Sequence, residues 1–372
     1  MDERKRICMI VQQRDVKGGI AAVVEGYYDS ALEERYNIRF VESYCDGPKI
    51  KKLLKAIGAY IRYFWVLCSF KPDLVHVHSS FGPSFYRMQP FLYMAKRRNI
   101  PVVDHCHGAD FDEFYTNAPD RKKKRIKKVF SDFSKVIVLS KKWQDKMALI
   151  VPKEHTEVIE NYCRPVSKEH LRGRLDERFS AKKILFLGEI GKRKGGFDFA
   201  RIVKETLERM PDAKFVFCGE GNAEDTRTIK EEIESLNPGA MESGLVRFPG
   251  WVRDKDKEKV LDEASVFILP SYNEGLPMSI LDAMAYGLPI ISTNVGGIPE
   301  LVNKGQNGFL SDPGDASDMA GHIADILSDQ GMYYKMSEES LNTAKERFGF
   351  DAHIKKLADV YESVMYSHPS RV

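Results

Sequence analysis

The chain has 372 residues, of which 43% are hydrophobic and 30% are charged, and its formal net charge is +3. This length allows two domains with separate hydrophobic cores, and the composition is typical of a globular protein. The net charge is too small to indicate nucleic acid as a partner. Six cysteines are scattered without a Cys-x-x-Cys pair, which predicts reduced thiols in a cytoplasmic protein and no cysteine metal site.

Neither a signal peptide nor a membrane span is expected. The apolar run at residues 7–11 follows basic residues but ends at Gln12 without a small-residue cleavage site, so it predicts a first strand. The longest candidate for a span, residues 56–70, is interrupted by Arg62. We therefore expect a chain that does not cross a membrane.

The first half of the chain alternates short apolar runs with segments of helical periodicity. We expect strands at 7–11, 38–41, 74–77, 101–103 and 136–139, and helices around 20–34, 49–70, 84–98 and 118–131. Repeated strand–helix units with nearly continuous apolar strands predict a parallel sheet with helices on both faces. Binding residues in such sheets lie beyond the carboxyl ends of the strands.

Two of these strand ends carry candidate site residues. Gly18 and Gly19 precede the first helical segment, where a backbone without side chains can approach an anion closely. A tight turn would explain the same glycines without a ligand. Beyond the fourth strand, His105 and His107 have a spacing that suits a metal pair, but no third ligand is evident nearby. A histidine bonded to the backbone at a strand end is the simpler interpretation.

Two segments of the first half are strongly basic. Residues 49–65 carry lysines on one side and aliphatic and aromatic side chains on the other, and residues 121–128 are denser still in basic residues. A basic amphipathic helix can lie on an anionic membrane surface. The alternative is a solvated helix face, with the other face packed on the core. Nucleic acid is not expected, because no recognised binding module accompanies the charge.

The second half repeats the alternating pattern. A polar stretch at 166–180 is interpreted as a linker, and strands are expected at 182–188, 214–218, 246–248 and 266–269. Two helices are expected within 315–346, followed by an amphipathic helix at 350–365. After the strand at 182–188, Arg193 and Lys194 lie in a glycine-bounded loop. Their cations suit a diphosphate, although loop charges are also commonly solvated.

The stretch 270–289 organises the second half of the chain. It runs from a strand through a glycine loop into a helix, and such a junction points backbone amides and a helix dipole at one spot, which suits a phosphate. Glu274 in the loop and Asp282, about two turns into the helix, are eight residues apart and are expected on the same side. Their carboxylates can hold sugar or ribose hydroxyls. An ordinary strand–helix junction with solvated acids is the alternative.

The same stretch carries a long motif. It reads Glu274-Gly-Leu-Pro-Met-x-x-x-Asp282, then Ala-Met-Ala-x-Gly-Leu-Pro-Ile-Ile-Ser-Thr-Asn-Val-Gly-Gly-Ile-Pro-Glu300, and continues to Gly308-Phe-Leu. This motif resembles the signature of the retaining glycosyltransferases of family 4, which have the GT-B fold. Two positions depart from the family pattern. Asp282 stands where the family usually has Glu, and Glu189 stands where a first Arg of the phosphate-binding loop is usual.

The resemblance implies an α/β protein with two Rossmann-like parallel-sheet domains that face each other across a cleft. We expect an acceptor-binding domain at residues 1–165 and a nucleotide-sugar-binding domain at residues 166–348. A terminal helix at 349–372 would cross back onto the first domain.

The resemblance also implies roles for individual residues. Glu274, His107 and Lys194 are the expected catalytic residues, and Asp110 is expected near the acceptor. The expected donor-binding residues are Gly18, Gly19, Arg193, Lys194, Trp251, Val252, Glu274, Gly275, Leu276, Pro277, Met278 and Asp282. Of these, Trp251 and Val252 would lie beside the nucleobase and Asp282 would hold the ribose. For Trp251, simple packing is the alternative.

The implied reaction transfers a hexosyl group from a nucleoside-diphosphate sugar to a hydroxyl with the anomeric configuration retained, and without a metal or other cofactor. A glycan or lipid-linked acceptor in surface polysaccharide synthesis is expected, in the cytoplasm or at the inner face of the plasma membrane. The alternatives are a sugar-nucleotide epimerase, a glycogen-type phosphorylase and a non-catalytic binding module. No motif for the cofactor lysine of a phosphorylase is seen, and Glu274 with Lys194 argues against a mere binding module.

Overall fold

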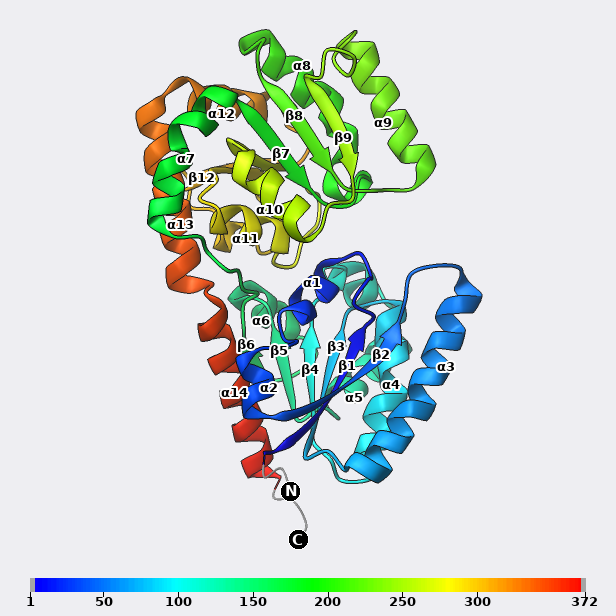
Figure 1. Cartoon of the computed structure of the whole chain (residues 1–372). Helices are drawn as coiled ribbons and strands as arrows, with labels where there is room; N and C mark the ends of the chain where they lie inside the picture. The colour runs from blue at the N-terminus through cyan, green and yellow to red at the C-terminus, as the bar shows by residue number, and fades with distance from the viewer. Residues whose placement is uncertain (1–3, 369–372) are drawn as a thin grey trace. The chain divides into compact units, whose positions relative to one another are not determined.

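The computed structural model describes residues 4–368, and the chain divides into two compact units (Figure 1). Unit 1 comprises the residues up to Asn161 together with those from Asp351 onward, and unit 2 comprises Tyr162–Phe350. Each unit contains one six-stranded sheet in which neighbouring strands are parallel.

The sheet of unit 1 has the strand order β2-β1-β3-β4-β5-β6. Its strands are β1 (Arg6–Gln12), β2 (Asn37–Tyr44), β3 (Leu74–Ser79), β4 (Val102–Cys106), β5 (Lys135–Val138) and β6 (Thr156–Val158). The first five strands confirm the prediction. The sixth was missed because its three residues, Thr156-Glu157-Val158, contain no apolar run that would indicate a strand.

Helices cover both faces of this sheet (Figure 1). They are α1 (Gly19–Glu25), α2 (Ala31–Arg35), α3 (Lys49–Trp65), α4 (Pro83–Lys96), α5 (Asp120–Phe130), α6 (Lys141–Met147) and α14 (Phe350–Ser367). Because alternate residues of a strand point to opposite faces, β3 serves two environments. Val75 and Val77 join the main apolar core with Phe91 of α4, whereas His76 bonds to Tyr361 of α14 on the other face.

Helix α3 continues through a π-helical turn, Val66–Phe70. By length and composition alone, the combined stretch Lys49–Phe70 would suffice to cross a membrane, and a third of its most apolar window is buried inside the protein. Core helices of ordinary domains satisfy the same criteria. The expectation that this segment does not span a membrane stays a prediction.

The sheet of unit 2 has the strand order β12-β11-β10-β7-β8-β9. Its strands are β7 (Lys183–Leu187), β8 (Lys214–Cys218), β9 (Val246–Gly250), β10 (Val266–Leu269), β11 (Ile290–Thr293) and β12 (Gly308–Ser311). The helices are α7 (Lys168–Ala181), α8 (Phe199–Arg209), α9 (Ala223–Leu236), α10 (Asp254–Glu263), α11 (Met278–Ala285), α12 (Ala316–Ser328) and α13 (Gln330–Arg347). Helices α12 and α13 confirm the two helices expected within 315–346.

The stretch expected to be a linker is largely helical, which corrects the prediction. Ser167 caps α7 by accepting a hydrogen bond from the backbone N–H of His170 at 3.0 Å. Within the helix, only Leu171, Leu175 and Arg178 are buried. Two leucines and an arginine do not form the apolar stripe by which an amphipathic helix is predicted, so the sequence pattern was that of a polar linker.

The strand order of unit 2 reverses between β7 and β10. From β7 the chain builds outward through β8 and β9, whereas β10 is followed on its other side by β11 and β12. At such a point, the loops after two adjacent strands run in opposite directions, and a crevice forms between them at the carboxyl ends of the strands. This crevice is the usual ligand site of such sheets. In unit 2 these are the loops that follow Leu187 and Leu269.

Candidate active site

The two loops at this switch point are joined by an ion pair between Lys194 and Glu274. The Lys194 Nζ lies 2.5 Å from the Glu274 Oε1, and the two side chains are only 12% and 6% exposed. The hydroxyl of Ser271 donates a second hydrogen bond to the same carboxylate oxygen at 2.7 Å. A carboxylate held by a cation and a hydroxyl in a largely buried position is fixed in orientation.

The loops approach closely because glycine occupies the contact points. Gly195 has a φ of +74°, and a Cβ there would lie 2.0 Å from the carbonyl oxygen of Pro270. Gly296, in the loop after β11, has a φ of +54°, and its Cβ would lie 1.8 Å from the carbonyl oxygen of Glu274. Only a residue without a side chain fits either place. These glycines therefore allow the close backbone packing that positions Lys194 and Glu274.

Glu274 is followed by Gly275, Leu276 and Pro277, and α11 then begins at Met278. Among the described residues, no side chain caps this helix start, so the first N–H groups of α11 are available to an external acceptor. Asp282 is the fifth residue of α11. It thus lies about one turn into the helix rather than the two turns expected, because the loop through Pro277 delays the helix start.

Both departures from the family pattern have a partner in unit 2. The Oε2 of Glu189 lies 3.2 Å from the Nη2 of Arg193, whose Nη1 is 3.8 Å from Glu274. Asp282 pairs with Lys257 of α10 at 3.0 Å. Glu189 thus holds a guanidinium near the candidate phosphate position, although it cannot itself bind a phosphate.

A cavity of about 710 Å³ lies beyond the carboxyl ends of β8 and β9. Its lining includes Gly219 and Gly221 after β8, Lys230 of α9 and Gly250 at the end of β9, but neither Lys194 nor Glu274. Trp251 and Val252, predicted beside the nucleobase, directly follow Gly250 and are partly buried. The cavity therefore adjoins the loop predicted to hold the base and lies apart from the ion pair.

The site residues predicted in the first half lie in unit 1. Gly18 has a φ of +152° and Gly19 begins α1, and a Cβ at either glycine would meet no atom of the described protein within 4 Å. The space beside both residues is thus open. Asp110 is exposed beyond β4.

His107 lies at the end of β4 and is part of a histidine cluster. Its Nε2 is 3.0 Å from the Nδ1 of His78 on the neighbouring strand β3. Burial lowers the pKa of His107 to about 3, so its imidazole is neutral at physiological pH. The sequence interpretation missed His76 and His78, whose ring nitrogens lie close to that of His105. The available signal was a second His-x-His, in the strand before β4.

The structure brings Arg193 and Lys194 to Glu274 within unit 2, and the loop 275–278 directly follows Glu274 in the chain. Asp282 lies on the helix that this loop begins, whereas Trp251 and Val252 follow the edge strand β9. Gly18, Gly19, His107 and Asp110 belong to unit 1.

Solved structures share this fold along nearly the whole chain. The sucrose-phosphate synthase from Thermosynechococcus elongatus matches with a TM-score of 0.78 and 17% identity, covering 98% of this chain and 100% of that one. Anabaena HepE in complex with UDP-glucose matches with a TM-score of 0.72 and 18% identity, covering 96% and 99%. Together with the two parallel sheets, these matches define an α/β protein with the GT-B fold.

Two family models match most of the chain. "Glycosyltransferase Family 4" matches residues 21–163, and "Glycosyl transferases group 1" matches residues 167–343. The chain therefore belongs to the glycosyltransferases of family 4.

Curated relatives match over different shares of their length. The 2-deoxystreptamine N-acetyl-D-glucosaminyltransferase of Niallia circulans is 33% identical over 156 residues, which cover 42% of this chain and 39% of that enzyme. The "Putative teichuronic acid biosynthesis glycosyltransferase TuaC" of Bacillus subtilis is 26% identical over 299 residues, which cover 79% of this chain and 71% of TuaC. The match thus spans less than half of the first relative and about two thirds of the second.

Proposed function

We propose that this protein transfers a hexosyl group from a nucleoside-diphosphate sugar to a hydroxyl of a glycan or lipid-linked acceptor, with retention of configuration and without a metal in the reaction. The observation that carries the proposal is the buried pair of Lys194 and Glu274 between the β7 and β10 loops. Membership of family 4, the binding of UDP-glucose by HepE and the similarity to TuaC, whose name assigns it to teichuronic acid biosynthesis, support it.

In this mechanism the leaving diphosphate is stabilised by cations and backbone amides. Lys194 and Arg193 supply the charge, and the N–H groups of residues 275–278 with the positive end of α11 supply oriented dipoles. Lys194 has three donors, so it can keep its bond to Glu274 while it binds a phosphate oxygen. Breaking the bond between the anomeric carbon and the diphosphate is thereby favoured.

The remaining residues position the sugar and the nucleoside. Glu274 accepts bonds from sugar hydroxyls and stabilises positive charge at the anomeric carbon, His107 orients the sugar, and Asp282 holds the ribose. Trp251 and Val252 receive the base, Gly18 and Gly19 admit the donor, and Asp110 is near the acceptor. No covalent nucleophile is required. The departing phosphate oxygen takes the proton of the acceptor hydroxyl as the new bond forms on the same face.

The decisive experiment measures release of nucleoside diphosphate from a panel of donors, with and without crude lipid-linked acceptors. Glu274→Gln should reduce acceptor-dependent release by about 100-fold or more, whereas Glu242→Gln, an exposed change in the same unit, should leave it unchanged. Equal activity in both variants would remove Glu274 from the mechanism. Turnover of the donor without acceptor would favour an epimerase, and donor binding without any turnover would favour a binding module.

We also propose that the enzyme works at an anionic membrane surface in the cytoplasm. The apolar side chains of α3 are mostly exposed rather than packed on the core, and they recur at helical spacing. They are Ile50, Leu53, Leu54, Ile57, Ile61, Phe64 and Trp65, between 45% and 73% exposed. The exposed lysines Lys49 and Lys51 lie on the same helix. An apolar stripe flanked by lysines matches the interface of an anionic bilayer.

Co-sedimentation with liposomes of anionic and neutral composition tests this surface. Wild-type protein should bind anionic vesicles and lose part of that binding in high salt. Leu54→Glu with Ile61→Glu should abolish binding, whereas Leu236→Glu, an exposed leucine of unit 2, should not. Binding that survives the α3 changes would contradict the assignment of this helix.

A further inference from the structure

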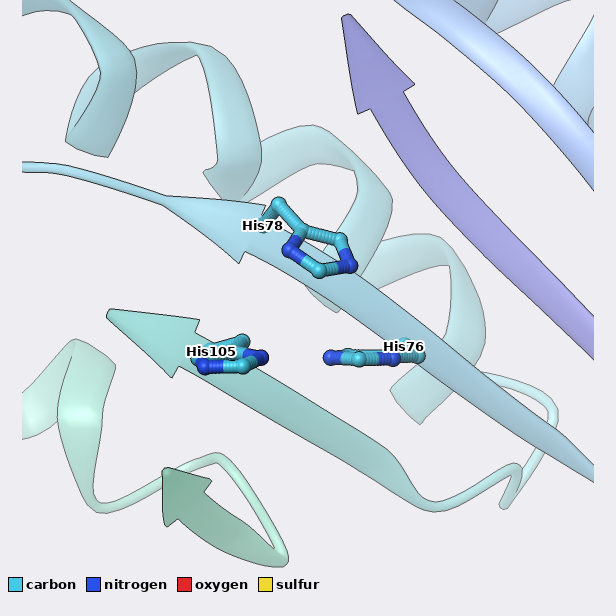
Figure 2. A group of neighbouring side chains, drawn as sticks. All are labelled: His76, His78 and His105. Carbon is cyan, nitrogen blue, oxygen red and sulfur yellow. The ribbon is translucent and has the colours of Figure 1, made fainter. Parts of the chain in front are cut away.

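Three buried histidines converge in unit 1 on the face of the sheet that α14 covers. His76 and His78 lie on β3 and His105 on β4, and one ring nitrogen of each lies within 4.8 Å of the others. Their side chains are at most 1% exposed. Figure 2 shows the rings of His76 and His105 edge to edge across the two strands, with His78 beside the space between them.

Several nitrogens of this cluster have no hydrogen-bond partner among residues 4–368. They are the Nε2 of His76, the Nε2 of His78 and both ring nitrogens of His105. Leaving a buried polar group unpaired costs about 1–3 kcal/mol, and buried polar groups in native proteins are nearly always paired. Several such nitrogens gathered in one place therefore indicate a ligand that accepts their lone pairs.

The outer nitrogens of two of these rings already have partners. The Nδ1 of His76 shares a hydrogen bond of 2.6 Å with the hydroxyl of Tyr361, and the Nδ1 of His78 shares one of 3.0 Å with the Nε2 of His107. A histidine that binds a metal usually donates its other N–H in this way, which directs a lone pair inward. When the Nδ1–H groups donate, both Nε2 atoms present lone pairs to the common space.

The spacing of the rings also suits one small ion. With a metal–nitrogen bond of about 2.1 Å, imidazoles on a tetrahedral ion have ring centroids about 5 Å apart. The three centroid distances are 4.3 Å between His76 and His78, 5.2 Å between His78 and His105, and 5.7 Å between His76 and His105.

We propose that His76, His78 and His105 bind a divalent transition-metal ion of the zinc class as a structural site that links β3 to β4. Three imidazoles are the ligands that zinc and its neighbours prefer, whereas magnesium and calcium require oxygen ligands. A water would complete the fourth position, and its deprotonation to hydroxide would reduce the buried charge from 2+ to 1+. The site takes no part in the transfer reaction and does not depend on the proposed function.

The burial of the cluster determines how it must be tested. Because the ligands are at most 1% exposed, the ion enters only when the protein folds or opens. Brief exposure of the folded protein to metal would therefore not load the site. The full chain, with any affinity tag removed, is unfolded with a chelator and refolded with either zinc chloride or chelator. Metal content after gel filtration should be about one zinc per chain in the first sample, with a higher melting temperature than in the second.

Two further measurements identify the ligands. X-ray absorption of the zinc-refolded protein should show nitrogen ligands at about 2.0–2.1 Å and no sulfur. His105→Gln should lose the bound zinc, whereas His155→Gln, an exposed histidine of the same unit, should keep it. If His105→Gln does not fold, the wild-type stoichiometry and absorption spectrum decide.

Three results would overturn the proposal. They are a zinc content near zero in refolded wild-type protein, sulfur in the absorption spectrum, and undiminished zinc in folded His105→Gln.

Discussion

Lys194 and Glu274 form an ion pair whose members are both largely buried. Without Lys194, the nearest cation to the Glu274 carboxylate is Arg193, at the longer distance of 3.8 Å. We expect Lys194→Met to lower the turnover number by about 100-fold or more, because a donor to the leaving phosphate is lost. The free energy of unfolding should fall by about 3–5 kcal/mol, because Glu274 stays buried. Donor kinetics and chemical denaturation measure the two effects.

Lys192 provides the matched control, since it lies in the same short turn but is exposed. Lys192→Met should change neither turnover nor stability appreciably. Comparable losses in both variants would show that turnover and stability depend on the total charge of this loop rather than on the position of Lys194.

Gly296 offers a second test at the scale of one residue. A methyl group there would meet the carbonyl oxygen of Glu274 at 1.8 Å, whereas at Gly305, which also has a positive φ, it would meet nothing within 4 Å of the described chain. Gly305→Ala should therefore cost only the backbone strain, about 1 kcal/mol. Gly296→Ala should lower the midpoint of denaturation much further and reduce turnover, and equal effects would contradict the close contact.

These residues show how far a motif can be interpreted. Lys194 and Glu274 were predicted as site residues because each stands in a glycine loop between a strand and a helix. Their mutual ion pair was not predicted, because the loops are distant in sequence and meet only when β7 and β10 are adjacent. His76 and His78 were missed for the same reason, since only the register of β3 on β4 brings them to His105.

At the scale of the element, α7 depends on a buried arginine. Arg178 is 1% exposed, and its guanidinium donates to the backbone oxygens of Asp262 and Tyr286 and to the carboxylate of Asp262. It thereby fastens α7 to α10 and to the end of α11. Arg178→Ala should reduce the free energy of unfolding by about 1–3 kcal/mol, because three partly buried acceptors lose their donor. Chemical denaturation measures the loss.

The same helix supplies a control in Arg172. This arginine is 66% exposed and pairs with Glu338, which is 47% exposed, so Arg172→Ala should change stability by less than about 1 kcal/mol. If Arg172→Ala were as destabilising as Arg178→Ala, the loss of stability would come from a general weakening of α7 and not from the buried guanidinium of Arg178.

Elements were predictable where a single face is consistently apolar. Nine strands of the two sheets were predicted from their apolar runs, and their ends lay within a few residues of the prediction, whereas β6, β11 and β12 were not predicted. Helix α7 was not predictable, because its main buried contact is an arginine. For α3 the amphipathic pattern was evident, but only the structure shows that Leu53, Leu54 and Trp65 face outward, since the sequence does not say which side of a helix meets the core.

At the scale of the whole molecule, the two units differ in how they use the chain. Unit 2 is one continuous segment, Tyr162–Phe350, whereas unit 1 combines the residues up to Asn161 with the far end of the chain. Helix α14 is integral to unit 1, since Leu357 and Tyr361 are fully buried and His353 bonds to the hydroxyl of Tyr27 at 2.7 Å. Folding of unit 1 must therefore wait for the last part of the chain to be synthesised.

This arrangement predicts how fragments behave. A fragment of residues 162–350 should unfold cooperatively on its own, whereas residues 1–161 lack α14 and should leave the histidine face of their sheet uncovered. Adding a peptide of residues 350–368 should restore a cooperative thermal transition, because it buries that face again. The same peptide carrying Leu357→Asp and Tyr361→Asp should not, since a buried unpaired carboxylate opposes docking. Circular dichroism melts distinguish the outcomes, and a cooperative transition of residues 1–161 alone would show that α14 is dispensable to unit 1.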